Sequence, residues 1–164
     1  MQTNITIKIQ KAIETLRASH IPHSKSIFYA ESIDSKMRAA IARWYAPIAS
    51  DENILLFTNK IQENFLGYFR TGICITDKAV YCRLQADTFL STITLNRSRK
   101  VFQLTDIKSM SIGKTDHCYG SNYEGHQLLI NGKVVGLIRM GGGMGADEDM
   151  ITELTQIFKA FDNE

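Results

Sequence analysis

The stretch from residue 72 to residue 84 reads GICITDKAVYCRL and decides the fold class of this chain. Two short runs rich in apolar and β-branched residues flank Asp77-Lys78, which predicts two strands joined by a two-residue turn. Because successive residues of a strand point to opposite sides, pairing across this turn fixes which residues share a face. One face is expected to hold Ile73, Ile75, Val80, Cys82 and Leu84, and the other Cys74, Thr76, Ala79, Tyr81 and Arg83.

More strands are expected on either side of this hairpin. The dipeptide Asn131-Gly132 predicts a type I′ turn, because both residues tolerate the positive φ angles that this turn requires. It would join strands at 126–130 and 133–140. Apolar runs and period-two patterns predict further strands at 54–57, 91–95, 101–104 and 110–112.

Three segments show helical spacing instead. Residues 4–20 and 35–46 carry apolar residues at intervals of three and four, and each segment is followed by a proline. Residues 147–161 begin with three acids and carry one apolar stripe, as the helix dipole and the burial of one face prefer. The chain is therefore expected to be an α+β protein.

We expect two parts, a helical arm at 1–50 and a strand-rich domain with its C-terminal helix at 51–164. The second helix runs almost directly into the first strand, so it is expected to dock on the strands of its own chain through Trp44. The first helix is tethered by a longer connector. It is expected to be less tightly packed than the second helix, and to reach a partner or a second copy of the chain.

Composition excludes several classes of protein. The 164 residues are 44% hydrophobic and 22% charged, which is typical of a globular protein with one main core. The net charge of +2 is too close to balance to require nucleic acid or an acidic membrane as a partner. Three cysteines without a CxxC motif favour a reducing compartment, and charges interrupt every apolar run, so we expect a cytoplasmic protein.

The order of these elements, together with the stretches 54–57, 72–81 and 130–133, resembles bacterial pleckstrin-homology-like (PH-like) domains over about residues 51–161. The resemblance implies a seven-stranded antiparallel, partly open barrel made of two nearly orthogonal sheets and closed by the C-terminal helix. Members of this family are known mainly as binding platforms for phosphoinositides, peptides or proteins. It therefore implies a binding module and leaves the ligand open.

Basic residues suggest where an anionic lipid would bind. Phosphoinositide-binding members carry a Lys near the end of the first strand and a Lys/Arg-x-Arg motif on the second. Lys60 and Arg70 would match the first and last of these positions, whereas Tyr68 replaces the other basic residue. The densest basic cluster, expected at the tip of a hairpin, is Arg97, Arg99 and Lys100. Each basic residue near an acidic membrane adds about 1 kcal/mol, so these residues predict at most weak contact with lipid.

Three short motifs have ordinary explanations. The run 141–146 matches the letters of a dinucleotide fingerprint, but the acids at 147–149 would repel a phosphate, and a connector is expected. Gly113-Lys114-Thr115 lacks the preceding glycine of a phosphate-binding loop and is expected to end a strand. The histidines do not have the spacing of metal ligands. We expect no metal and no cofactor.

The sequence thus favours a non-enzymatic module that binds a protein or peptide, or a second copy of the chain. The alternative is weak contact with anionic lipid through Lys60, Arg70, Arg97, Arg99 and Lys100. A third reading is an enzyme that uses Cys118 as its nucleophile, with His117 and residues from elsewhere in the chain.

Overall fold

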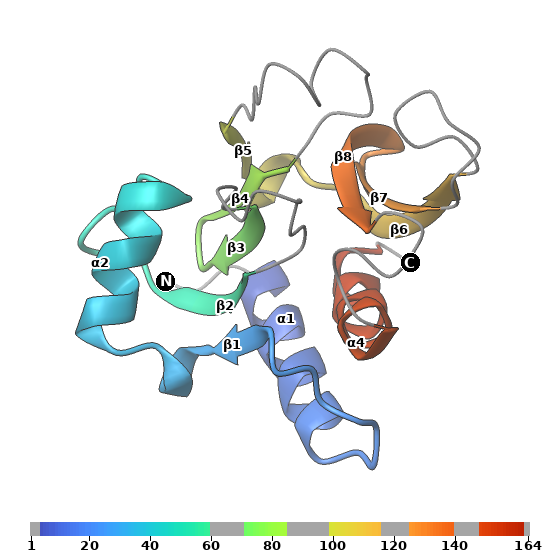
Figure 1. Cartoon of the computed structure of the whole chain (residues 1–164), viewed down its shortest axis with the longest axis horizontal. Coiled ribbons are helices and arrows are strands. Elements are labelled where there is room, and N and C mark those ends of the chain that lie inside the picture. Colours follow the sequence, from blue (N-terminus) through green and yellow to red (C-terminus); the bar gives the residue numbers. More distant parts are fainter. Residues whose placement is uncertain (1–3, 60–70, 85–98, 116–124, 140–147, 163–164) are drawn as a thin grey trace, which may run out of the picture.

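The computed structural model describes residues 4–59, 71–84, 99–115, 125–139 and 148–162 (Figure 1). Its helices are α1 (Asn4–Arg17), α2 (Ser35–Trp44) and α4 (Glu148–Phe158), with short 3-10 turns η1 (Ala30–Ser32), η2 (Leu104–Asp106) and η4 (Lys159–Phe161). Its strands are β1 (Ile27–Tyr29), β2 (Ile54–Thr58), β3 (Gly72–Thr76), β4 (Ala79–Arg83), β5 (Arg99–Gln103), β6 (Met110–Thr115), β7 (Gly125–Ile130) and β8 (Lys133–Arg139).

The strands form two antiparallel sheets. The larger sheet has the order β1-β2-β3-β4-β5, and the smaller one has the order β6-β7-β8. These sheets and the three helices confirm the α+β class and the antiparallel pairing. The described strands do not join into a closed barrel.

Both predicted hairpins are present. In the first, Ile73 lies opposite Cys82 and Cys74 lies opposite Tyr81. In the second, Asn131 and Gly132 have φ angles of 52° and 73°, as a type I′ turn requires. The Asn131 side chain also accepts from the backbone N–H of Lys108 at 2.7 Å, which ties the turn to the segment before β6.

The two predicted faces of β3 and β4 belong to two separate hydrophobic clusters. One cluster contains Ile73, Ile75, Val80, Cys82 and Leu84 together with residues of α1, α4 and the smaller sheet. The other contains Cys74, Ala79 and Tyr81 together with Ile41 of α2. The larger sheet is therefore covered by α2 on one face and by α1 and the smaller sheet with α4 on the other (Figure 1).

Helix ends follow from local chemistry. The Asp34 side chain accepts from the backbone N–H of Met37 at 2.7 Å and caps the start of α2. The first helix ends at Arg17, three residues earlier than the apolar pattern predicts, and the Ser19 hydroxyl then donates to the carbonyl of Leu16. The last helix begins with Glu148 and Asp149 in its first turn, as predicted.

The expectation that the first helix is the freer of the two N-terminal helices is wrong, because it packs into the main core. Ile9 of α1 is fully buried, Ile13 and Leu16 are nearly so, and all three belong to the same cluster as the β3 and β4 residues. Three-residue β1, inside the connector, also pairs with β2. The proposed division at residue 50 stays a prediction about folding units, but residues from both sides of it share one core.

The role expected for Trp44 is also wrong. Trp44 is only partly buried, and the guanidinium carbon of Arg43 lies 4.8 Å from the centre of its ring. Ile41 and Tyr45 instead carry the contact of α2 with the sheet, and the Tyr45 ring meets Phe57 edge to face at 4.8 Å. The strand predicted at 91–95 lies outside the described residues.

Candidate functional site

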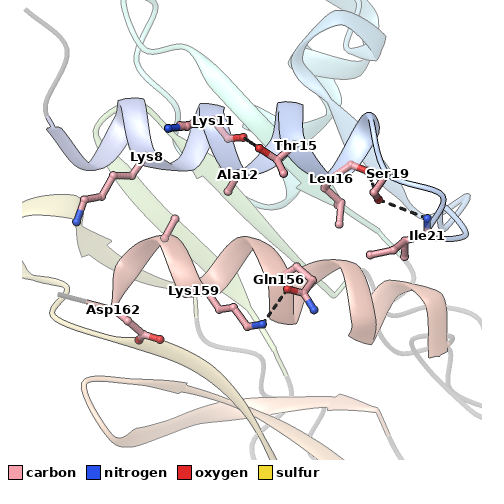
Figure 2. A pocket seen from close by; sticks show the side chains of 11 residues that line it. Lys8, Lys11, Ala12, Thr15, Leu16, Ser19, Ile21, Gln156, Lys159 and Asp162 are labelled. Atoms are coloured by element: carbon pink, nitrogen blue, oxygen red, sulfur yellow. Dashed lines mark hydrogen bonds between the residues drawn. The ribbon is translucent and has the colours of Figure 1, made fainter. Parts of the chain in front are cut away.

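A groove of about 780 Å³ lies between α1 and α4 and continues along η4. Figure 2 shows the two helices running antiparallel along it, with Lys8 and Asp162 near one end and Ile21 near the other. The volume is in the range of pockets that hold small ligands or the side chains of a docked helix. Its apolar lining is made by Ala12, Leu16, Ile21 and Ala160.

Three lysines line the groove, and two of them lie on α1. Lys8, Lys11 and Lys159 are all exposed, and the Lys159 Nζ donates to the Gln156 side chain at 2.9 Å. Neither Lys8 nor Lys11 forms an ion pair with an acid of the described segments. Among the described residues of the lining, Asp162 is the one acid. The described part of the lining therefore carries more positive than negative charge.

The groove is open because several of the side chains that line it are either small or hydrogen-bonded to the backbone of their own segment. Ala12 and Ala160 each contribute only a methyl group. The Thr15 hydroxyl donates to the carbonyl of Lys11 at 2.8 Å, and the Ser19 hydroxyl donates to the carbonyl of Leu16 at 2.5 Å. Both hydroxyls of the lining are thus used within α1 and the turn that follows it, so the floor offers mainly apolar contact.

A buried acid of α4 holds the wall of this groove in place. Glu153 has no exposed surface, and its carboxyl oxygens accept from the Ser24 backbone N–H and, at 2.7 Å, from the Tyr29 hydroxyl. His23 Nδ1 lies 3.7 Å from the same carboxyl group. These contacts join α4 to the connector that follows α1. Burial, and then the hydrogen bond to Glu153, raise the pKa of Tyr29.

A second buried acid joins α2 to the β3-β4 hairpin. The Glu52 carboxyl accepts from the Tyr81 hydroxyl at 3.0 Å and from the Thr76 hydroxyl, and the Arg38 guanidinium donates to the Glu52 carbonyl at 2.7 Å. Burial and then the hydrogen bond to Glu52 raise the pKa of Tyr81 to about 12. A raised tyrosine pKa means that the folded state favours the neutral hydroxyl. The contribution of Tyr81 to the free energy of unfolding is therefore fully present below about pH 10 and lost as the pH rises towards 12. Glu52 and Glu153 are both buried, so we interpret them as acids that stabilise the fold.

Two of the five predicted anion-contact residues are described, and each donates to a backbone carbonyl. Arg99 donates to the Arg43 carbonyl at 3.0 Å, and Lys100 donates to the Val135 carbonyl at 2.9 Å. Arg83, paired with Arg99 across the sheet, donates to the Trp44 carbonyl at 2.5 Å. These arginines sit at the C-terminal end of α2, where cations satisfy the last carbonyls of a helix. Lys60, Arg70 and Arg97 lie outside the described residues.

The remaining motif residues are placed as follows. Gly113-Lys114-Thr115 ends strand β6, as predicted. His117, Cys118 and the run 141–146 lie outside the described residues. No group of three potential metal ligands occurs within the described part of the chain.

We expect Cys74 and Cys82 to resist thiol reagents until the protein unfolds. Both thiols are buried and form no disulfide, and burial raises the pKa of Cys74 and raises that of Cys82 to about 12. The thiolate is the reactive form, so it is both scarce and closed off at pH 8. Labelling with Ellman's reagent in a Cys118→Ser variant, with and without denaturant, measures this. Rapid labelling of the folded variant would show that β3 and β4 are open to solvent.

Comparisons with known proteins identify no relative of this chain. No family model, curated protein or solved structure matches this chain. Among the helices of the described segments, none combines the length and the apolar character that crossing a membrane requires. Function is therefore inferred from the groove and from the order of the elements.

Proposed function

We propose that this chain is a non-enzymatic binding module whose ligand is a segment of a partner protein, held in the groove between α1 and α4. The observation that carries the proposal is the groove itself, with its apolar lining of Ala12, Leu16, Ile21 and Ala160 and its lysines at one end. Helical segments of partner proteins commonly bind in grooves of this kind through their apolar face.

The order of the elements gives separate support. A hairpin-rich pair of antiparallel sheets followed by a C-terminal helix is the order expected of the PH-like domains that the sequence resembles. That likeness is part of the proposal, and it favours a platform for proteins or peptides. One fold can host many functions, so the groove carries more weight in this proposal than the likeness of the fold.

The other readings have less support. The tyrosine-carboxyl contacts of the described residues, at Glu52 and Glu153, are buried where no substrate reaches. The described basic residues of the lipid alternative, Arg99 and Lys100, each donate to a carbonyl of their own chain. Both features suit a binding module better than an enzyme or a lipid anchor.

Filling the groove is expected to abolish partner binding. Ala12 lines the groove and is only partly buried, so the indole of an Ala12→Trp variant would occupy the space of the ligand. Ala39→Trp, on the exposed face of α2, is the matched control. Each protein is immobilised, exposed to a lysate of the cells that naturally express it, and compared by quantitative mass spectrometry after thermal melts confirm folding.

The expected result is a set of proteins retained by the parent and by Ala39→Trp and lost by Ala12→Trp. Binding of the same proteins by all three would show that the groove is not the site. Loss in both variants would assign the effect to the added tryptophan and count against the proposal.

A further inference from the structure

The groove is not uniform along its length. Lys8 and Lys11 lie towards the end where α1 begins, the Lys159 ammonium lies near the middle beside Gln156, and Ile21 lies towards the other end (Figure 2). The rise of 1.5 Å per residue places Lys8 and Leu16 about 12 Å apart along α1. A ligand that fills the groove therefore meets cations at one end and an apolar surface at the other.

The electrostatics of the charged end favour an anionic ligand. Three lysines and one acid, Asp162, are the charged residues of the described lining, and the Lys159 ammonium is held by a neutral amide rather than by an acid. Exposed cations that repel one another gain from an opposite charge placed among them, although each exposed pair contributes only about 0.2–1 kcal/mol. Several acids on one ligand are needed for a clear preference.

The shape of the groove favours a helix as the occupant. Two antiparallel helices present rows of side chains between which a third helix can pack, and the methyl groups of Ala12 and Ala160 allow a close approach. The length from Lys8 to Ser19 corresponds to about eleven residues of helix, or three turns.

We infer that the partner segment is a short amphipathic helix with acidic residues in one half and apolar residues in the other. Its acids lie beside Lys8, Lys11 and Lys159, and its apolar side chains lie on Ile21 and on the small part of Leu16 that the core leaves exposed. This inference rests on the proposed function and adds the chemistry and the orientation of the ligand. It commits to a segment of another protein, in preference to a second copy of this chain or a lipid surface.

The test uses two fluorescent helical peptides of about fourteen residues, slightly longer than the groove. The acidic probe has glutamates in its N-terminal half, where they suit the helix dipole, and leucines on one face of its C-terminal half. The basic probe replaces the glutamates with lysines. Fluorescence anisotropy at low salt measures both affinities for the full chain, because salt screens exposed charges.

Three proteins are compared: the parent, a groove variant with Lys8→Glu, Lys11→Glu and Lys159→Glu, and a control with Lys25→Glu, Lys36→Glu and Lys133→Glu. The control lysines are exposed and lie outside the groove, and both variants have the same net charge. We expect the parent and the control to bind the acidic probe at least about tenfold more tightly than the basic probe. The groove variant is expected to reverse this preference.

Three results would overturn the inference: no binding of the acidic probe by the parent up to about 1 mM, equal binding of both probes, or equal effects of the two triple variants. Light scattering and vesicles of phosphatidylserine test the other occupants in the same experiment. Dimers of the parent that Ala12→Trp separates, or vesicle binding that the groove variant loses, would also overturn it.

The failure of this inference can be told from the failure of the proposed function. Some proteins are expected to be captured by the parent and lost by Ala12→Trp. If the groove variant still captures these proteins, the groove binds a partner but not through acids. If Ala12→Trp changes nothing in the capture experiment, the proposed function itself fails.

Discussion

Deleting residues 1–20 is expected to leave a chain that no longer folds cooperatively. The deletion removes Ile9, Ile13 and Leu16 from the main core and uncovers their partners on α4 and η4, among them Phe161. It also removes the Thr6 hydroxyl, which donates to the Asp77 carbonyl at 3.2 Å in the turn of the β3-β4 hairpin. Losing three buried aliphatic side chains, at about 2–5 kcal/mol each, removes about as much as the 5–15 kcal/mol stability of a typical domain. Circular dichroism melts and proton NMR dispersion measure the result.

Two isoleucines of the same helix provide the matched control. Ile9 is fully buried and Ile7 is 52% exposed, so the same substitution samples both sides of α1. We expect Ile9→Ala to lower the free energy of unfolding by about 2–5 kcal/mol and Ile7→Ala to change it by about 0.5 kcal/mol or less. Equal effects of the two substitutions, or a truncated chain with a sharp melt, would show that α1 is a separate arm.

The pairing within the two hairpins could be predicted because it depends on local signals. The Asp77-Lys78 and Asn131-Gly132 turns set the register of their hairpins, and register decides which residues share a face. That is why the two faces of β3 and β4 were assigned correctly residue by residue. By contrast, β1 has only three residues, which is too short for a period-two pattern to stand out.

The packing of the two N-terminal helices could not be predicted, because it depends on contacts distant in sequence. Amphipathic spacing shows that a helix buries one face and does not show what covers that face. The size of Trp44 and the short connection to β2 favoured α2 as the better buried helix. The structure instead places the Trp44 ring beside Arg43, and it packs α1 against the C-terminal helix about 140 residues away in sequence.

The candidate groove was missed for the same reason. In the sequence, Lys8 and Lys11 are charges within an apolar pattern, and Lys159 is a cation near the end of a helix. No single segment shows that the three lie on one surface. Glu153 did leave a signal, since it falls three residues after Met150 and four before Ile157 on the buried side of α4. An acid within an apolar stripe indicates a buried hydrogen-bonded group.

Replacing Glu153 with alanine is expected to lower the free energy of unfolding by about 2–5 kcal/mol, because the substitution leaves the Tyr29 hydroxyl and the Ser24 N–H without their buried acceptor. Asp149→Ala, an exposed acid of the same helix, should cost less than about 1 kcal/mol. Tyr29→Phe should cost about 1 kcal/mol, and adding it to Glu153→Ala should cost less than the sum, since one donor then needs no acceptor. Urea titrations of the four variants measure these differences. Strict additivity, or a Glu153→Ala variant as stable as Asp149→Ala, would show that this acid does not hold the connector to α4.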